Sequence, residues 1–169
     1  DGALIVAEDA GNRVRRIDQM GTTSLVAGTG VAGGTDGAGT VARFTGAMGV
    51  AVSSLGRIYI AETAGHRIRE IRKTGGDAMS AASYTVSTLA GNGTAGYVDG
   101  VGTSARFSVP RGVAVDAGGN VYVADSGNRR IRMIRPAGHV TTIAGSGASG
   151  AADGSGEAAT LASPYGVTV

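Results

Sequence analysis

A three-fold internal repeat constrains the fold of this chain more than any other feature. Three similar segments recur: LIVAEDAGNRVRRI from Leu4, IYIAETAGHRIREI from Ile58 and VYVADSGNRRIRMI from Val121. Each is followed by an LVAG-, TLAG- or TIAG-type segment, a glycine-rich stretch with an Asp-Gly pair, and a GVAV or GVTV segment. The two periods are 54 and 63 residues. Periods of this length indicate one supersecondary unit stacked on its own copies.

Each unit is expected to contain four short β-strands, twelve in the chain. Val, Ile, Tyr and Thr dominate the segments, as pleated and half-buried surfaces favour, and glycine-containing turns such as 116–120 separate them. The 31 glycines follow no collagen-like period and suit many tight turns. The i, i+3, i+4 spacing of a helical repeat is absent. The pattern predicts an all-β protein with essentially no helix, built from β-propeller blades.

The unequal periods are explained by one insertion. The nine extra residues of the longer period lie between Ile71 and Leu89, in the segment GGDAMSAASY. Insertions confined to one turn are tolerated by surface hairpins. We therefore expect a longer hairpin loop at this place.

The repeating unit resembles the NHL repeat. Residues 110–145 carry the likeness best, with Pro-Arg-Gly-Val-Ala-Val, then Gly-Asn-Val-Tyr-Val-Ala-Asp-Ser-Gly-Asn-Arg-Arg-Ile-Arg, then Val-Thr-Thr-Ile-Ala-Gly. The resemblance covers essentially the whole chain and implies propeller blades of four antiparallel strands. For function it implies several classes, because NHL-like propellers include protein-binding scaffolds, RNA-binding domains and lyase-type enzymes.

The ends of the chain do not coincide with the ends of a blade. Residues 1–169 form a single propeller segment with repeats at about 1–52, 53–115 and 116–169. Residues 166–169 are expected to be a lone first strand, which completes a blade begun at residue 1. Three blades are too few for a ring, since propellers have four to eight, and open sheet edges favour pairing with another chain. We expect a homodimer with six blades; the alternative is a piece of a longer propeller.

Arginines that recur in every unit have a structural explanation. They occupy two registers: Arg13, Arg67 and Arg130, then Arg15, Arg69 and Arg132. A ring of arginines can bind phosphates, but repetition in every blade favours stems packed between blades and guanidinium groups bound to carboxylates or turn carbonyls. The expected carboxylate partners are Glu8, Glu62 and Asp125. In the same way Arg43 and Arg106 are expected to accompany Asp36 and Asp99.

The glycine-rich stretches contain the G-x-G-x-x-G pattern three times, starting at Gly28, Gly91 and Gly145. A dinucleotide-binding loop places such glycines before a helix, whose N-terminal amides face the phosphates. No helical pattern follows any of the three stretches. The pattern therefore predicts structural turns.

Positions that differ between the repeats are better candidates for a binding site. The residue before the first-strand glycine is Met48, Arg111 or Tyr165. The resemblance places this position near the mouth of the central channel, where ligands and partners dock. His66 is a further candidate, because it replaces an asparagine and an arginine of the other repeats.

Composition excludes several other functions. The chain has no cysteine, so disulfides, zinc–thiolate sites and thiol nucleophiles are excluded. Its two histidines have no marked Ser or Asp partner, so we expect neither catalytic residues nor a metal site or cofactor. A net charge of +2 does not require nucleic acid, and the longest apolar run, 3–7, is too short for a membrane span. The compartment stays open.

These observations favour a binding or scaffold module for a protein or a small ligand rather than an enzyme. Two alternatives remain: part of a six-bladed lyase- or hydrolase-type enzyme, and an RNA-binding domain.

Overall fold

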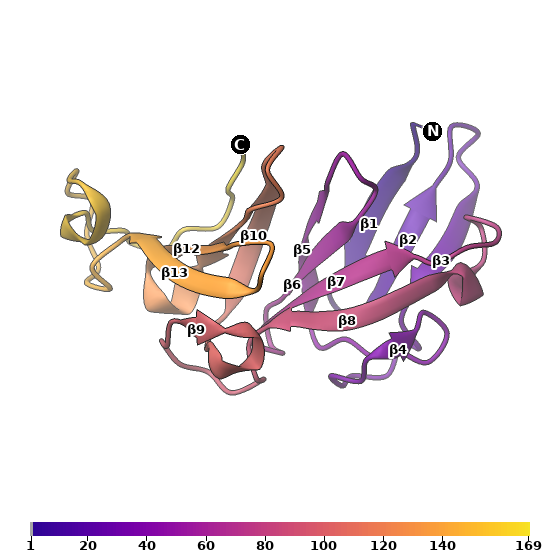
Figure 1. The fold of residues 1–169 in the computed structure, drawn as a ribbon, viewed down its shortest axis with the longest axis horizontal. Helices are drawn as coiled ribbons and strands as arrows, with labels where there is room; N and C mark the ends of the chain where they lie inside the picture. Colours follow the sequence, from indigo (N-terminus) through magenta and orange to yellow (C-terminus); the bar gives the residue numbers. More distant parts are fainter. Residues whose placement is uncertain (1) are drawn as a thin grey trace.

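Three antiparallel sheets fan out in chain order in the computed structural model, which describes residues 2–169 (Figure 1). The first sheet contains β1 (Leu4–Glu8), β2 (Arg13–Ile17) and β3 (Thr23–Ala27). The second contains β4 (Gly37–Ala38), β5 (Ala47–Val52), β6 (Ile58–Glu62), β7 (Arg67–Lys73) and β8 (Tyr84–Ala90). The third contains β9 (Gly100–Val101), β10 (Pro110–Val115), β11 (Val121–Asp125), β12 (Arg130–Ile134) and β13 (His139–Ala144).

The strand order confirms propeller blades. The orders are β1-β2-β3, then β5-β6-β7-β8-β4, then β10-β11-β12-β13-β9, with every pair antiparallel. The only helical segments among the described residues are 3-10 turns of three residues each: η1 (Ala81–Ser83), η2 (Gly102–Ser104), η3 (Ser126–Asn128) and η4 (Gly156–Ala158). The chain is therefore all-β, as its sequence predicts.

Two features differ from the expected four strands per blade. Each complete sheet has a fifth strand, because β4 and β9 come from the connection that leaves the preceding blade and pair with β8 and β13. Residues 166–169, expected to be a strand, form none. Within residues 2–169 no strand pairs with them, and a strand needs a partner for its backbone donors and acceptors.

The hydrophobic cores lie between blades. Side chains alternate across a strand, so in β6 Ile58 and Ile60 face the first blade while Tyr59 and Ala61 face the third. Phe44 is fully buried in the first core, and Phe107 in the second. The middle blade is therefore covered on both faces. The outer blades each keep one open face.

The inner strands pack closely because glycine faces the neighbouring backbone. A Cβ atom on Gly49 would collide with the carbonyl oxygen of Arg111, and one on Gly112 would collide with that of Tyr165. Close backbone approach of this kind requires glycine. The two contacts fix how the first strands of successive blades stand around the axis.

The insertion does more than lengthen a hairpin. Residues 74–83 connect β7 and β8, and the sulfur of Met79 accepts hydrogen bonds from Arg16 and from Ser24 of the first blade. Tyr84 donates its hydroxyl to the carbonyl of Ala78 within the loop. The insertion therefore ties the second blade to the first.

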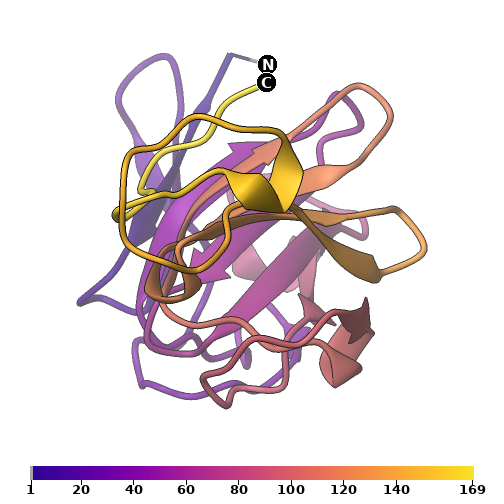
Figure 2. The ribbon, with the colours of Figure 1, turned by 90° about the vertical axis from the view of Figure 1, so that its left-hand side faces the viewer.

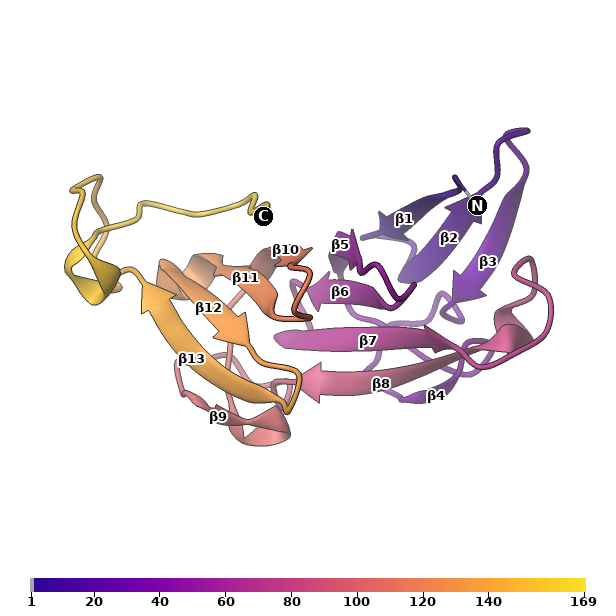
Figure 3. The ribbon, with the colours of Figure 1, turned by 45° about the horizontal axis from the view of Figure 1, so that its top comes forward.

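The last residues form an arm without a sheet of its own. This C-terminal arm (residues 145–169) makes a loop beyond β13 and then runs back beside β10 (Figures 1 and 3). Viewed along the row of sheets, it lies in front of the third sheet (Figure 2). None of the helices in the described part of the chain is long and apolar enough to cross a membrane.

Candidate functional site

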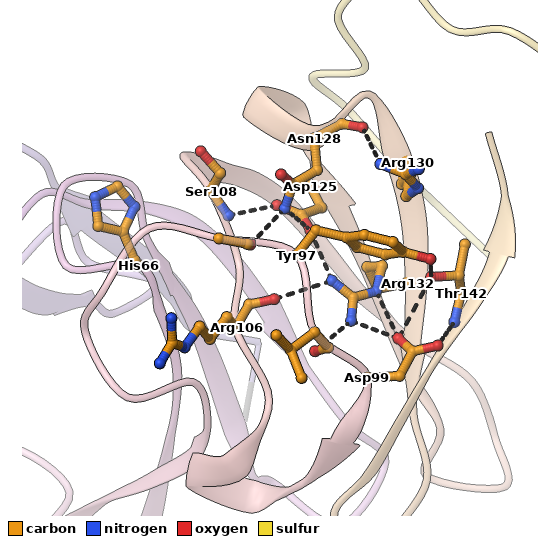
Figure 4. A network of polar contacts seen from close by, with 12 residues as sticks. His66, Tyr97, Asp99, Arg106, Ser108, Asp125, Asn128, Arg130, Arg132 and Thr142 are labelled. Carbon is orange, nitrogen blue, oxygen red and sulfur yellow. Dashed lines mark hydrogen bonds and ion pairs between the residues drawn. The ribbon is translucent and has the colours of Figure 1, made fainter. Parts of the chain in front are cut away.

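A buried arginine lies at the centre of each blade boundary. Arg132 on β12 donates to Asp125 at 2.9 Å, to Asp99 at 2.5 Å and to the carbonyl of Arg106 at 3.0 Å (Figure 4). Its side chain is 0% exposed. Arg69 on β7 makes the same set of contacts one blade earlier, with Glu62, Asp36 and the carbonyl of Arg43. The repetition shows that these arginines bind the connection from the preceding blade to their own blade.

These arginines confirm the expected ion pairs with Glu62 and Asp125. Burial raises the pKa of the Glu62 carboxyl above its usual range, and the nearby Arg69 and the N–H of Thr45 oppose this shift. Burial likewise raises the pKa of Asp125, against the hydrogen bonds from Asn128 and from the N–H of Ser108. Removing a carboxylate from water disfavours its charged form.

The predicted pairing of Arg43 and Arg106 with the aspartates is wrong. Asp36 is bound by Arg69 and Asp99 by Arg132, each from a position 33 residues later in the chain. The side chains of Arg43 and Arg106 are exposed. The chain reaches the next blade before it reaches the aspartate. Each aspartate is therefore bound by an arginine of that blade and not by the arginine that follows it closely in sequence.

The glycine-rich stretches are turns whose carbonyl groups bind the other set of recurring arginines, Arg13, Arg67 and Arg130. Arg130 donates to the carbonyl of Ser146 at 2.6 Å, and Arg67 and Arg13 donate to the carbonyls of Asn92 and Thr29. Gly30, Gly93 and Gly147 have φ of 85°, 89° and 89°, and a Cβ on any of them would collide with these guanidinium groups. The loops therefore hold arginine, and the expectation of structural turns is confirmed.

His66 lies between the second and third blades. It has a φ of 52°, and its Nδ1 accepts the N–H of Val109 at 3.1 Å. Asn12 does the same one blade earlier, where its side-chain oxygen accepts the N–H of Gly46 at 3.0 Å. One ring nitrogen of His66 is therefore occupied by a hydrogen bond between blades.

Two of the three candidates predicted to lie at the channel mouth are in contact. The guanidinium carbon of Arg111 lies 3.8 Å from the centre of the Tyr165 ring, a cation–π stack. Tyr165 is 56% exposed and Met48 is 40% exposed. Met48 precedes Gly49, whose backbone lies against Arg111. The structure thus brings Arg111 and Tyr165 together and leaves Met48 one strand away.

Arg111 differs from the arginines between blades. Arg69 and Arg130 donate hydrogen bonds through their terminal nitrogens, whereas the guanidinium of Arg111 makes no hydrogen bond or ion pair among residues 2–169. The stack on Tyr165 holds the guanidinium plane without using its donors. A partly buried guanidinium with free donors is suited to a planar, bidentate acceptor such as a carboxylate.

Hollows adjoin the blades in the described part of the chain. A cavity of about 690 Å³ lies between the first and second blades and is lined by β1, β5 and β7 residues. The matching cavity between the second and third blades is about 240 Å³. A third, about 270 Å³, follows the axis along Val50–Val52, Val113–Val115 and 167–169. The first cavity exposes Val50–Val52, because within the described residues the first blade has no inner strand beside β1.

Sequence reasoning missed Tyr97. Its ring lies 3.7 Å from the guanidinium carbon of Arg130, and its hydroxyl accepts from Thr142 at 3.1 Å (Figure 4). The signal was available, since Gly34 and Ala151 stand at this place in the other units. No group of three or more His, Cys, Asp or Glu side chains in the described range is arranged to hold a metal ion.

Known proteins resemble this chain in sequence and fold. Protein SUPPRESSOR OF QUENCHING 1, chloroplastic, of Arabidopsis thaliana is 30% identical over 138 residues, 76% of this chain and 12% of that protein. Human Teneurin-4 is 36% identical over 95 residues, 53% of this chain and 3% of that protein. The chain thus spans a small fraction of these relatives.

An auxiliary nutrient binding protein from Bacteroides thetaiotaomicron superposes with a TM-score of 0.73 at 25% identity, over 99% of this chain and 40% of that one. The profile of the Teneurin NHL domain matches residues 14–135, which run from within β2 to the end of β12. The sequence repeat, the four-stranded pattern and this match agree, and the chain belongs to the Teneurin NHL domain family of β-propellers.

Proposed function

We propose that this chain is a binding module whose ligand site is the channel mouth formed by Met48, Arg111 and Tyr165. The observation that carries the proposal is the stack of Arg111 on Tyr165, in which the guanidinium makes no hydrogen bond or ion pair within residues 2–169. Arg111 would bind a carboxylate while Tyr165 and Met48 contact an apolar body attached to it. The likeness to a nutrient binding protein supports a role in ligand binding.

The mouth belongs to a ring that we propose to be completed by a second copy, giving six blades. Leu4 is 64% exposed and Val6 also faces solvent, on the face of β1 that corresponds to the buried face of β6. Gly166 would meet nothing if it carried a Cβ, whereas Gly49 and Gly112 each meet the next inner strand. A head-to-tail contact closes when the rotation per chain completes a circle, and six blades lie in the common range.

The ligand proposal is tested by NMR titration of the labelled chain with benzoate and, as a neutral match, benzamide. We expect benzoate to shift the side-chain signals of Arg111 and Tyr165, and benzamide to leave them in place. Arg111→Gln should abolish the shifts, whereas Arg106→Gln, which changes an exposed arginine outside the proposed site, should keep them. Benzoate shifts that survive Arg111→Gln, or that avoid the mouth altogether, would contradict the proposal.

The assembly is tested by light scattering on the untagged chain. We expect a mass twice the 16.5 kDa of one chain. A folded species that stays at the mass of one chain at high concentration would show that a second copy does not complete the ring.

A further inference from the structure

The cavity between the second and third blades has two complete blades as its walls. Its volume is about 240 Å³, and residues of the β5–β6 and β10–β11 turns line it. These turns follow the ends of β5 and β10, whereas Met48 and Arg111 lie near the beginnings of the same strands. Binding pockets of drug-sized ligands measure about 300–1,000 Å³. The cavity therefore suits a small ligand at a place separate from the channel mouth.

A buried carboxylate lies in the wall of this cavity. Glu70 on β7 is 4% exposed. Its Oε2 binds Nε and Nη2 of Arg72, both at 2.8 Å, and its Oε1 accepts from Nη1 of Arg57 at 3.4 Å. A carboxylate removed from water requires such partners. Glu70 thus fixes two guanidinium groups at the cavity.

The two guanidinium groups keep donors that Glu70 does not use. Arg57 binds Glu70 through one nitrogen and Arg72 through two, although a guanidinium group carries five N–H donors on three nitrogens. Their side chains are 40% and 55% exposed. Arg57 also donates to the hydroxyl of Tyr59, a buried residue that lines the same cavity.

A third arginine gives the cavity an excess of positive charge. Arg135 follows β12 and lines the cavity from the third blade. It is exposed, and its side chain makes no hydrogen bond or ion pair among residues 2–169. The second acid of the cavity, Asp116, has both oxygens bonded by Asn120 and Tyr122, and these bonds hold its pKa below the ordinary value. Three arginines against two acids leave one positive charge unbalanced.

The arrangement of Arg57 and Arg72 around Glu70 occurs once in the chain. The residues at the places of Arg57 and Glu70 are Ala3 and Arg16 in the first repeat and Asn120 and Met133 in the third. The arginines that bind the connections between blades recur in every repeat. An arrangement present in one blade alone is therefore not required by the fold.

We propose that this cavity binds the phosphate group of a small phosphate monoester. Arg57, Arg72 and Arg135 come from three separate segments of the chain. The three terminal oxygens of a phosphate monoester can accept hydrogen bonds from all three, whereas a carboxylate offers two oxygens in one plane. Leu55, which is 80% exposed, and Pro136 line the cavity beside them and offer apolar contacts to the organic part of the ester.

The proposal is tested by NMR titration of the whole chain with phenyl phosphate, followed through the side-chain N–H signals of Arg57, Arg72 and Arg135. We expect phenyl phosphate to shift these signals saturably, and phenol, which lacks the phosphate, to leave them in place. Inorganic phosphate should bind more weakly, because it leaves the apolar part of the cavity unfilled. Benzoate should also bind this cavity more weakly, because it has one oxygen fewer for the three arginines.

Arg135→Gln is the decisive variant, because this side chain has no partner inside residues 2–169 and its loss should leave the fold intact. The dissociation constant of phenyl phosphate should rise at least about tenfold, since a charged hydrogen bond to the phosphate is lost. Lys73→Gln is the matched control. It removes the same charge from the neighbour of Arg72, which does not line the cavity, so the constant should stay within about twofold.

The contrary results are equally definite. Shifts that avoid the three arginines, or a dissociation constant that Arg135→Gln changes no more than Lys73→Gln does, would show that the phosphate does not bind here. Inorganic phosphate that binds as tightly as phenyl phosphate would overturn the assignment of an organic ester. Benzoate that binds this cavity as tightly would overturn the choice of phosphate. None of these results bears on the channel mouth, whose test follows Arg111 and Tyr165.

Discussion

Residues 91–115 and the C-terminal arm are nearly the same stretch of sequence in two surroundings. Both begin with a glycine-rich turn, continue with an Asp-Gly pair and end in a GVAV or GVTV segment. The first lies against the third blade, where Phe107 is fully buried and 110–115 form β10. The arm has the same turn but neither a strand at 166–169 nor a buried Leu161. The loop conformation is therefore local, whereas the strand and the core depend on the next blade.

The largest difference in the free energy of unfolding is expected between substitutions of Arg132, at a packed blade boundary, and of Arg15, on the open first blade. Arg132→Met leaves the buried carboxylate of Asp125 without its counter-charge, so the free energy of unfolding should fall by about 3–5 kcal/mol. Arg15→Met, measured at concentrations where the chain is monomeric, should cost less than about 1 kcal/mol, as exposed ion pairs do. Urea unfolding of both variants measures this. Equal losses would contradict the distinction between the two boundaries.

The fold was predictable from the sequence where its signals are local. Alternating Val and Ile predicted the strands, and the recurrence of Glu62 and Asp125 beside Arg69 and Arg132 predicted the pairs at the boundaries. The fifth strands were not predictable, because β4 and β9 have two residues each and pair with strands formed later in the chain. Residues 166–169 form no strand within the single chain because a strand needs a neighbour to pair with, and their pairing in a completed blade stays a prediction.

The candidate site was predictable only in part. Variation between repeats singled out Arg111 and Tyr165, and the structure brings them into contact, but their role in binding stays a prediction. The partner of Asp99 was misassigned because nearness in sequence pointed to Arg106. The constant spacing of 33 residues was the signal that could have found it. The contact of Met79 with the first blade could not be predicted from the sequence, because the insertion occurs in one repeat and the other repeats offer no equivalent residue for comparison.

A smaller effect is expected at the inner strands. Gly49→Ala places a methyl group against the carbonyl oxygen of Arg111, which must move, and overpacking of this kind costs about 1–3 kcal/mol. Gly166→Ala meets nothing within one chain and should be neutral in the monomer. Thermal unfolding of the two variants checks the difference. A loss for Gly166→Ala in the monomer would mean that the arm is packed more tightly than its contacts indicate.

The smallest effect concerns pH. The pKa of Glu62 is raised by burial above its ordinary value of 4.5, so the folded chain holds this proton more tightly than the unfolded chain does. The contribution to stability is present below about pH 4.5 and is lost as the pH rises through the folded pKa. Glu62→Gln should therefore flatten the fall in the free energy of unfolding as the pH rises above about 4.5. An unchanged slope in this variant would show that the carboxyl does not titrate in that range.

The bridge made by Met79 has a consequence for the order of folding. The first blade is synthesised first, yet one of its supports, Met79 in the loop of residues 74–83, lies 55 residues after its partner Ser24 in β3. Contacts of such long sequence separation form late, because a large loop must close before they are made. We expect the sheet of β5 to β8 to form before the sheet of β1 to β3. The backbone amides of the N-terminal blade should therefore become protected from hydrogen exchange later than those of the second blade.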